Sequence, residues 1–230
     1  MSTLYLHQIH DLRQGTEAAF EAHVRDEWLP VVNAHEGSRF AWYGTATSAA
    51  RLADEAITIV AFDDMSAFEG FAVAERESTA TRALRAQRSG VQTRLLRPID
   101  YDPWTAADTA IPDGPREGAT VAYMHDFVPP VTGQMRGYID MMRERYMALS
   151  SQALSGVVLR TSWQTVSGGG RMPEMFNLSE IRDVDALVAL IAHEIPRDYK
   201  QMGTWMWEAL ATRDQWTTRL ARSATWSPVK

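Results

Sequence analysis

Hydrophobic and polar positions in the first part of the chain follow the periods of strands and helices in turn. Alternation predicts strands over residues 4–12, 39–47, 56–62 and 91–98. An apolar stripe at helical spacing predicts a helix that opens at Gly15 and stops at Gly37, and Pro30 inside it should kink or locally unwind it. Asp64 should cap a second helix that begins at about residue 67. The predicted order is therefore β-α-β-β-α-β.

The rest of the chain repeats this pattern. Strands are predicted over residues 120–128, 157–166, 174–181 and 217–225, and helices over 134–154 and 184–212. A run of three glycines, residues 168–170, joins two of these strands. Because no helix follows the run at phosphate-loop spacing, we predict a hairpin there rather than a nucleotide-binding loop.

Three short segments recur in both series and in the same order. The matches are IHDL at 9–12 with MHDF at 124–127, RFAW at 39–42 with RTSW at 160–163, and TRLLR at 93–97 with TRLAR at 218–222. They lie 115, 121 and 125 residues apart, so only the loop lengths differ. The chain is therefore predicted to carry one unit twice.

The duplication predicts an α+β fold of tandem ferredoxin-like repeats. Each β-α-β-β-α-β unit makes a four-stranded antiparallel sheet with both helices on one face. The two open faces must be covered, and packing them together gives one α/β barrel with the helices outside. We expect the first half at residues 1–104, a Pro/Gly/Asp-rich linker at 105–118 and the second half at 119–230.

The first copy resembles the NIPSNAP-like branch of the dimeric α/β-barrel superfamily. The resemblance rests on WLP at 28–30, HEG at 35–37, FAWY at 40–43, VAFDD at 60–64 and RLLRP at 94–98, and it extends more loosely to the second copy. It implies a dimeric-type α/β barrel. The superfamily includes cofactor-free monooxygenases of aromatic polyketides, cyclases, lyases, muconolactone-type isomerases, EthD-like proteins and haem-dependent chlorite dismutases. This resemblance specifies an architecture better than an activity.

Composition excludes several classes of function. The net charge is −6 and no Lys/Arg cluster stands out, which argues against a nucleic-acid partner. The chain has no cysteine, so thiolate nucleophiles and Cys-type zinc sites are excluded. No apolar run approaches the roughly 18 residues of a membrane span, and the N-terminus does not read as a signal peptide. We therefore expect a cytoplasmic protein with a small-molecule substrate, no membrane partner and possibly a homodimeric state.

Histidines are the first candidates for chemistry. His10 and His125 stand at the same place in the repeat, each followed by an aspartate, and each is a candidate general base or substrate ligand. The alternative is a strand-end histidine hydrogen-bonded to the backbone. His7 is also predicted to be catalytic; it should face away from His10, so the two are not expected to share a metal ion. Copy two has Ala122 at the position that this alignment gives to His7, which predicts one working site, in the first half.

Three further residues are predicted to be catalytic. Glu27 falls inside the apolar stripe of the first helix, and Arg145 falls at the matching place in the second copy, where it is assigned to substrate binding. The alternative is that such side chains extend to solvent from the edge of the stripe. Tyr43 could supply a phenolic proton. His35 lies near a helix C-terminus, so capping is its alternative role.

Aromatic and arginine side chains complete the predicted site. Trp28 on the first helix and Trp42 and Trp163 on the second strands are assigned to substrate binding, together with Arg39. An arginine beside aromatic rings can hold an anionic or enolate oxygen and stack on a flat ring. The alternative for Arg39 is a strand-edge charge that forms an ion pair.

These residues predict a cofactor-independent enzyme. Histidine acid/base chemistry would form an enolate or phenolate of a small apolar, aromatic or polyketide-like substrate, followed by cleavage, cyclisation, isomerisation or oxygenation. We expect no metal and no cofactor. The alternative is a non-catalytic NIPSNAP-like ligand-binding or scaffold protein, and a further one is a haem-binding barrel with a histidine ligand.

Overall fold

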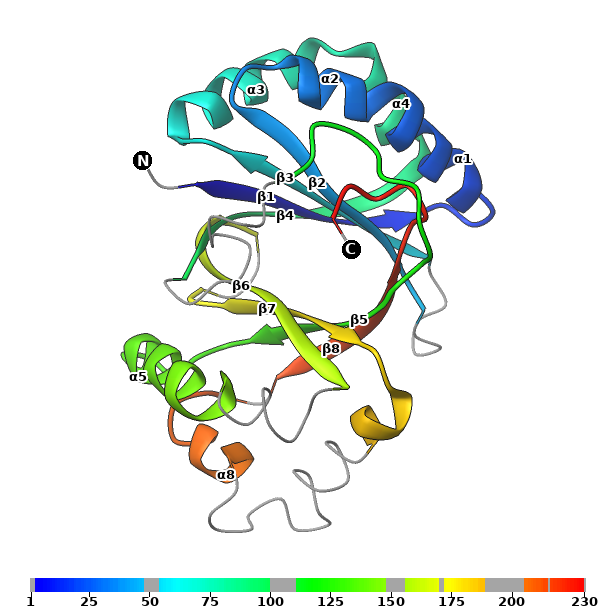
Figure 1. Ribbon diagram of the computed structural model, residues 1–230. Helices are drawn as coiled ribbons and strands as arrows, with labels where there is room; N and C mark the ends of the chain where they lie inside the picture. Colours follow the sequence, from blue (N-terminus) through cyan, green and yellow to red (C-terminus); the bar gives the residue numbers. More distant parts are fainter. Residues whose placement is uncertain are drawn as a thin grey trace.

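The computed structural model describes residues 3–47, 54–99, 111–147, 156–169, 172–188, 205–214 and 216–229. Within these ranges the strands β1 to β8 close into one barrel, with helices on its outside (Figure 1). In the described part of the chain, no helix has the length and apolar character needed to cross a membrane.

The first half contains four strands and two helical connections. Its elements are β1 (Leu4–Leu12), α1 (Glu17–His23), a π-helical turn (Val24–Trp28), α2 (Leu29–Ala34), β2 (Ser38–Ala46), β3 (Glu55–Phe62), α3 (Met65–Glu77), α4 (Thr79–Gln87) and β4 (Arg88–Pro98). The described elements of the second half are β5 (Ala122–Val128), α5 (Met135–Met141), a second π-helical turn (Met142–Tyr146), β6 (Val157–Gly168), β7 (Met175–Ile181), α8 (Trp205–Ala209) and β8 (Thr217–Ser223). The parts of the two predicted second-half helices at 148–154 and 189–204 lie outside the described residues.

The order of the strands confirms the predicted duplication. Around the barrel it is β4-β1-β3-β2-β8-β5-β7-β6 and back to β4, so each half contributes the same antiparallel order. The sheets meet at two seams, where β2 pairs with β8 over residues 44–46 and β4 pairs with β6 over residues 94–98. The α+β barrel of two ferredoxin-like halves is thus the observed fold.

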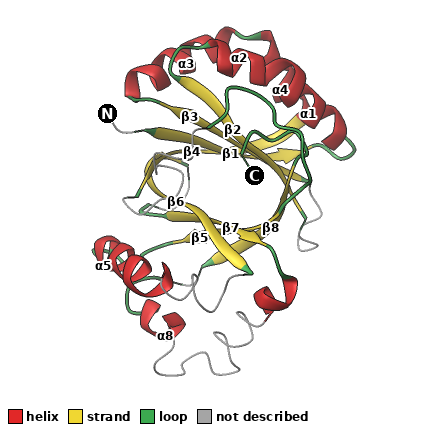
Figure 2. Cartoon of the chain, viewed as in Figure 1, coloured by secondary structure: helices red, strands yellow, loops and turns green. Residues whose placement is uncertain are grey.

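Each strand has one face toward the barrel interior and one toward the helices. In β1, Leu4 and Leu6 pack with helix residues, whereas Tyr5 and Ile9 pack with residues of the second half inside the barrel. The helices α1 to α4 cover the first sheet, and α5 and α8 lie on the outer side of the second (Figure 2). His7 therefore points into the barrel and His10 points toward the helices.

A π-helical turn interrupts the long helix of each half. The turn at Val24–Trp28 precedes Pro30, where local unwinding was predicted, and the helix then continues as α2. Proline does not by itself explain the turn, because the second half has the same turn at Met142–Tyr146 in a segment without proline. A π-helical turn has one more residue than an α-helical turn, so it changes which side chains face the sheet. This change moves Glu27 and Arg145 away from the sheet.

The N-terminus of α3 is capped by Asp64, as predicted. Its Oδ1 accepts a hydrogen bond from the backbone N–H of Ala67 at 3.0 Å. Asp64→Ala should lower the free energy of unfolding by about 1 kcal/mol, since one N–H of the first turn loses its acceptor. Urea denaturation measures the change, and Asp64→Asn, which keeps an acceptor, should restore most of it.

The C-terminal segment returns from the second half to the first. Trp226 stacks on Phe40 with ring centroids 5.9 Å apart and donates a hydrogen bond to Glu21 Oε1 at 2.8 Å. Backbone hydrogen bonds join Val229 to Ala41 and also join Arg116, in the predicted linker, to Trp226. The core of the first half is therefore completed by residues from the end of the chain.

Candidate active site

The pairing of strands shows which residues of the two halves are equivalent. His7 lies opposite Ile59 and Arg94, and His125 lies opposite Leu178 and Arg219, in the same arrangement of strands. His7 is therefore the counterpart of His125. The prediction that His10 and His125 are equivalent was wrong, because the HD motifs match with a shift of three residues and a strand reverses its facing at every residue. The predicted asymmetry between His7 and Ala122 was wrong for the same reason.

His7 and His125 meet at the centre of the barrel. Their ring centroids are 5.0 Å apart, and their exposed fractions are 0% and 1%. Among the described residues, none of the four imidazole nitrogens has a hydrogen-bond partner. Buried polar atoms are rarely left unpaired, since each costs roughly 1–3 kcal/mol. The histidine pair is therefore costly for folding, which makes it the candidate functional site.

Both histidines are neutral at pH 7. Burial, followed by the charges of Arg219 and Arg94, lowers the pKa of His125 to about 3. Burial and then the neighbouring His125 lower the pKa of His7 well below its usual value. Each ring therefore carries one N–H donor and one nitrogen lone pair.

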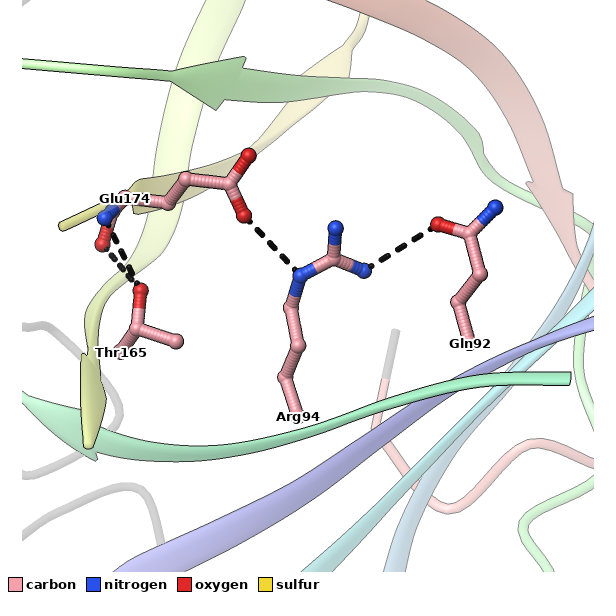
Figure 3. Close-up of polar contacts among 4 residues, drawn as sticks. All are labelled: Gln92, Arg94, Thr165 and Glu174. Atoms are coloured by element: carbon pink, nitrogen blue, oxygen red, sulfur yellow. Dashed lines mark hydrogen bonds and ion pairs between the residues drawn. The ribbon is translucent and has the colours of Figure 1, made fainter. Parts of the chain in front are cut away.

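An arginine beside each histidine is held by a glutamate of the opposite half. Arg94 Nε of β4 donates to Glu174 Oε2 at 3.0 Å, and Arg219 Nε of β8 donates to Glu55 Oε2 at the same distance. Figure 3 shows Arg94 between Glu174 and Gln92, and its Nη1 lies 3.4 Å from Gln92 Oε1. The six residues His7, His125, Arg94, Arg219, Glu55 and Glu174 are called the central cluster below.

Thr165 fixes the position of Glu174. Its hydroxyl donates to the Glu174 carbonyl at 2.6 Å and accepts from the Glu174 N–H at 3.1 Å (Figure 3). Glu174 lies just before β7, as Glu55 lies at the start of β3, so the carboxylates occupy equivalent places. Neither glutamate was predicted as a site residue, although both stand at the start of the third strand of their copy, and this recurrence could have identified them.

Aromatic rings line the central cluster. The guanidinium of Arg94 lies 5.1 Å from the ring centroid of Phe176, and that of Arg219 lies 4.5 Å from that of Phe127. His7 is 5.3 Å from Phe176, and His125 is 4.6 Å from Phe127. The cluster thus combines neutral imidazoles, two cations and flat apolar walls.

Two predicted substrate-binding tryptophans also lie inside the barrel. Trp42 packs edge-on against Tyr123 with centroids 5.5 Å apart, and Trp163 lies 5.6 Å from Tyr5. Both tryptophans are fully buried. The structure therefore places His7, His125, Trp42 and Trp163 of the predicted site in one compartment.

His10, Tyr43 and Trp28 lie together on the other face of the first sheet. Arg88 Nη1 lies 2.6 Å from His10 Nδ1, and Thr58 Oγ1 lies 2.9 Å from His10 Nε2. Arginine can only donate, so Nδ1 is the acceptor and the ring proton is on Nε2. Both nitrogens are thus engaged. Tyr43 lies opposite Thr58, and burial raises the pKa of its phenol.

Four other predicted residues lie toward the surface. Glu27 is exposed and pairs with His23 at 3.1 Å, and Arg145 is exposed and pairs with Glu208 at 2.8 Å. Their predicted placement toward the sheet was wrong, because the π-helical turns shift the apolar stripe. Arg39 forms an exposed ion pair with Asp63, which is its alternative role. His35 Nε2 lies 3.2 Å from the Ala67 carbonyl, outside the barrel.

Three described histidines, His10, His23 and His35, are held in other contacts, which leaves His7 and His125 as the described histidines whose nitrogens have no partner. His7 and His125 face each other with ring centroids 5.0 Å apart inside the barrel. Both nitrogens of His10 are engaged, and His23 is held between Glu27 and the Ala80 carbonyl. His193 lies outside the described residues. Within the described ranges, no three metal-ligating side chains cluster together.

Solved structures of similar shape exist, although no family model and no curated protein sequence matches the chain. An anthrone oxidase-like protein superimposes with a TM-score of 0.65 over 97% of this chain and 92% of its own, at 10% identity. A monooxygenase candidate from Lactobacillus acidophilus NCFM gives 0.62 over 96% and 94%, also at 10% identity. Chlorite dismutase from Candidatus Nitrospira defluvii gives 0.55 over 96% and 91%, at 10% identity.

This chain has the dimeric α/β-barrel fold. The barrel architecture expected from the sequence is thereby confirmed. NIPSNAP family proteins match 44% of this chain, with TM-scores of 0.36 and 0.37. Sequence identities near 10% show that the fold is shared, and a shared fold does not by itself assign the activities of these proteins to this chain. The function of this chain depends on the side chains inside its barrel.

Proposed function

We propose that the protein is a cofactor-independent enzyme that removes a proton from a small aromatic or polyketide-like substrate in the barrel interior. The observation that carries the proposal is the pair of buried imidazoles, whose four nitrogens lack partners among the described residues. Monooxygenase-type and anthrone oxidase-like proteins with this fold support the choice of substrate class. His7, predicted as catalytic, is the base in this proposal.

The two histidines divide the chemistry between them. The lone pair of His7 accepts a proton from an acidic C–H or O–H group, while the N–H of His125 donates to the substrate oxygen. A base with a low pKa works here only if the product anion stabilises the imidazolium that forms. A nearby enolate or phenolate does so, because opposite charges attract strongly in a buried site.

The arginines stabilise the anion as it forms. Arg94 and Arg219 are held in place by Glu174 and Glu55 before the reaction, so little reorganisation is needed. Phe127 and Phe176 offer flat surfaces to an aromatic substrate. The anion then undergoes cleavage, cyclisation, isomerisation or reaction with O2, and the central cluster favours none of these fates over the others.

Proton exchange tests the proposed proton removal, whatever reaction the anion then undergoes. Anthrone is a suitable probe, because its C10 protons are acidified by a ketone and its enolate is aromatic. The wild-type protein should accelerate exchange of these protons in D2O, followed by NMR, and His7→Ala should slow the catalysed exchange by about 10²-fold or more.

His10→Ala is the matched control, since His10 lies on the same strand but faces the helices. It should retain the wild-type exchange rate, and circular dichroism should show both variants folded. Equal rates for wild type and His7→Ala would refute the proposal. Binding of the probe without any exchange would instead favour the non-catalytic ligand-binding role.

A further inference from the structure

The layers between sheet and helices differ in polarity between the two halves. In the second half, this layer contains Tyr138 and Tyr146 at the positions of Phe20 and Trp28, which occupy the same places relative to the π-helical turns. The strand pairing likewise equates Ser179 with Val60, Asn177 with Thr58 and Asp126 with Gln8. Five equivalent positions are thus more polar in the second half. We call these five residues of the second half, with Arg213, the second layer.

Asp126 is the least satisfied member of the second layer. It is 7% exposed, and its Oδ1 accepts no hydrogen bond from the described part of the chain. A side-chain hydrogen bond from Thr218 reaches its carboxyl group, and Arg213 is the nearby cation. Burial nevertheless raises the pKa of Asp126 to about 6. The carboxyl group is therefore held in a poorly solvated place with one oxygen unused.

The tyrosines are oriented by the same strands. Tyr138 shares a side-chain hydrogen bond with Asn177, and Tyr146 lies close to Ser179. Asn177 also accepts a hydrogen bond from Ser162 at 2.6 Å. Asn177 thus holds the phenol of Tyr138 in place, while Asp126 Oδ1 has no partner among the described residues. In the described part of the chain, Asp126 Oδ1 and Ser179 Oγ are the two second-layer atoms without a partner, and Asp126 Oδ1 is the one that carries charge.

The second layer also has apolar walls and an approach for solvent. Val128, Ile139, Met142, Leu159 and Met175 pack with the two tyrosines in one cluster. Along β8, Thr218 is exposed and Leu220 is 39% exposed, whereas Leu95, the residue of β4 equivalent to Leu220, is 6% exposed. The strand that borders Asp126 is therefore more open in the second half than in the first.

Folding alone does not explain these substitutions. The first half shows that the same scaffold packs with Phe20, Trp28 and Val60 at these positions. Replacing them by polar groups and leaving a carboxylate oxygen unpaired destabilises the fold. A ligand that donates a hydrogen bond to this oxygen would offset the free energy lost by leaving it unpaired.

We propose that the second layer binds a small hydroxylated aromatic ligand whose hydroxyl group donates a hydrogen bond to Asp126 Oδ1. The hydroxyl is the required donor, and the tyrosine and methionine side chains contact the ring. This site is separate from the central cluster, because Asp126 and His125 are adjacent on β5 and point to opposite faces of the sheet.

Titration with 4-fluorophenol, followed by 19F NMR, tests the proposal. The wild-type protein should bind the probe saturably. Asp126→Leu removes the acceptor and should weaken binding at least tenfold. Asp126→Asn, which keeps the shape but loses the charge, should weaken it severalfold, since hydrogen bonds to ionised acceptors are about twice as strong as neutral ones. The methyl ether 4-fluoroanisole, which lacks the donor, should bind at least tenfold more weakly than the phenol.

Gln8→Leu is the matched control, because Gln8 occupies the equivalent position in the first half. It should keep the wild-type affinity, as should His7→Ala in the barrel interior. Absence of saturable binding to the wild type, or equal affinity of wild type and Asp126→Leu, would overturn the proposal. Loss of binding in His7→Ala would also overturn it, because the phenol would then occupy the barrel. These outcomes do not depend on whether His7 catalyses proton exchange in anthrone, so the two proposals can fail separately.

Discussion

Lowering the pH from about 8 to about 5 should reduce the free energy of unfolding by about 4 kcal/mol through His7 and His125 alone. The unfolded chain takes up a proton at each histidine near the usual pKa of about 6.5. In the folded state, burial lowers the pKa of His125 to about 3 and that of His7 well below its usual value. Protonation of the unfolded chain therefore costs the fold nothing above about pH 6.5, and this cost grows as the pH falls toward the folded-state pKa.

Urea denaturation at several pH values measures this loss. The double variant His7→Leu/His125→Leu replaces the two buried imidazoles by apolar side chains and should show a much flatter pH dependence. The control His35→Gln changes a partly exposed histidine outside the barrel and should keep the wild-type slope. A double variant with the wild-type slope would show that the two rings do not carry the effect.

Two other groups modify the slope in opposite directions. Burial, followed by the charge of Arg88, lowers the pKa of His10, so His10 adds to the acid sensitivity in wild type and double variant alike. Asp126 acts the other way, since a raised carboxyl pKa gives stability that is present at low pH and lost as the pH rises through about 6. The difference between wild type and the double variant isolates His7 and His125.

Glu174→Gln should destabilise the fold by about 3–5 kcal/mol. The side chains of Arg94 and Glu174 are 5% and 11% exposed, and their ion pair joins β4 of the first half to the start of β7 in the second. Removing the carboxylate leaves the guanidinium buried without its counter-charge, which is far costlier than the loss of an exposed pair. Thermal and urea denaturation measure the change.

Asp63→Asn provides the matched control. It breaks the ion pair between Arg39 and Asp63, whose side chains are 39% and 51% exposed, and should cost at most about 1 kcal/mol. The double variant Arg94→Met/Glu174→Gln should be less destabilised than the sum of the single variants, because it leaves no unpaired charge. Equal costs for Glu174→Gln and Asp63→Asn would mean that the buried ion pair stabilises the fold no more than the exposed one does.

Much of the architecture could be predicted because it depends on local pattern. Alternation located β1 to β8 within a few residues, and Asp64 was recognised as a helix cap from its residue type alone. The repeat then indicated two ferredoxin-like halves. The β period also placed His7 and His10 on opposite faces, since that inference needs only their spacing.

The site was harder to predict, because small register errors have large consequences. The match of the two HD motifs suggested that His10 corresponds to His125, whereas the strand pairing equates His125 with His7. A shift of three residues is odd and therefore reverses the facing of every side chain. For Glu27 and Arg145, one π-helical turn in each half was enough to move the apolar stripe away from them.

The sequence by itself determined the order of elements, their duplication and the alternation of faces along each strand, because these follow from the chemistry of neighbouring residues. Only the tertiary structure decided that His7 meets His125 and that Arg94 and Arg219 each take a glutamate from the opposite half. Those contacts join residues about 80 to 160 positions apart. They depend on the register in which the two sheets close the barrel, and the pairing of distant strands sets that register rather than any local pattern.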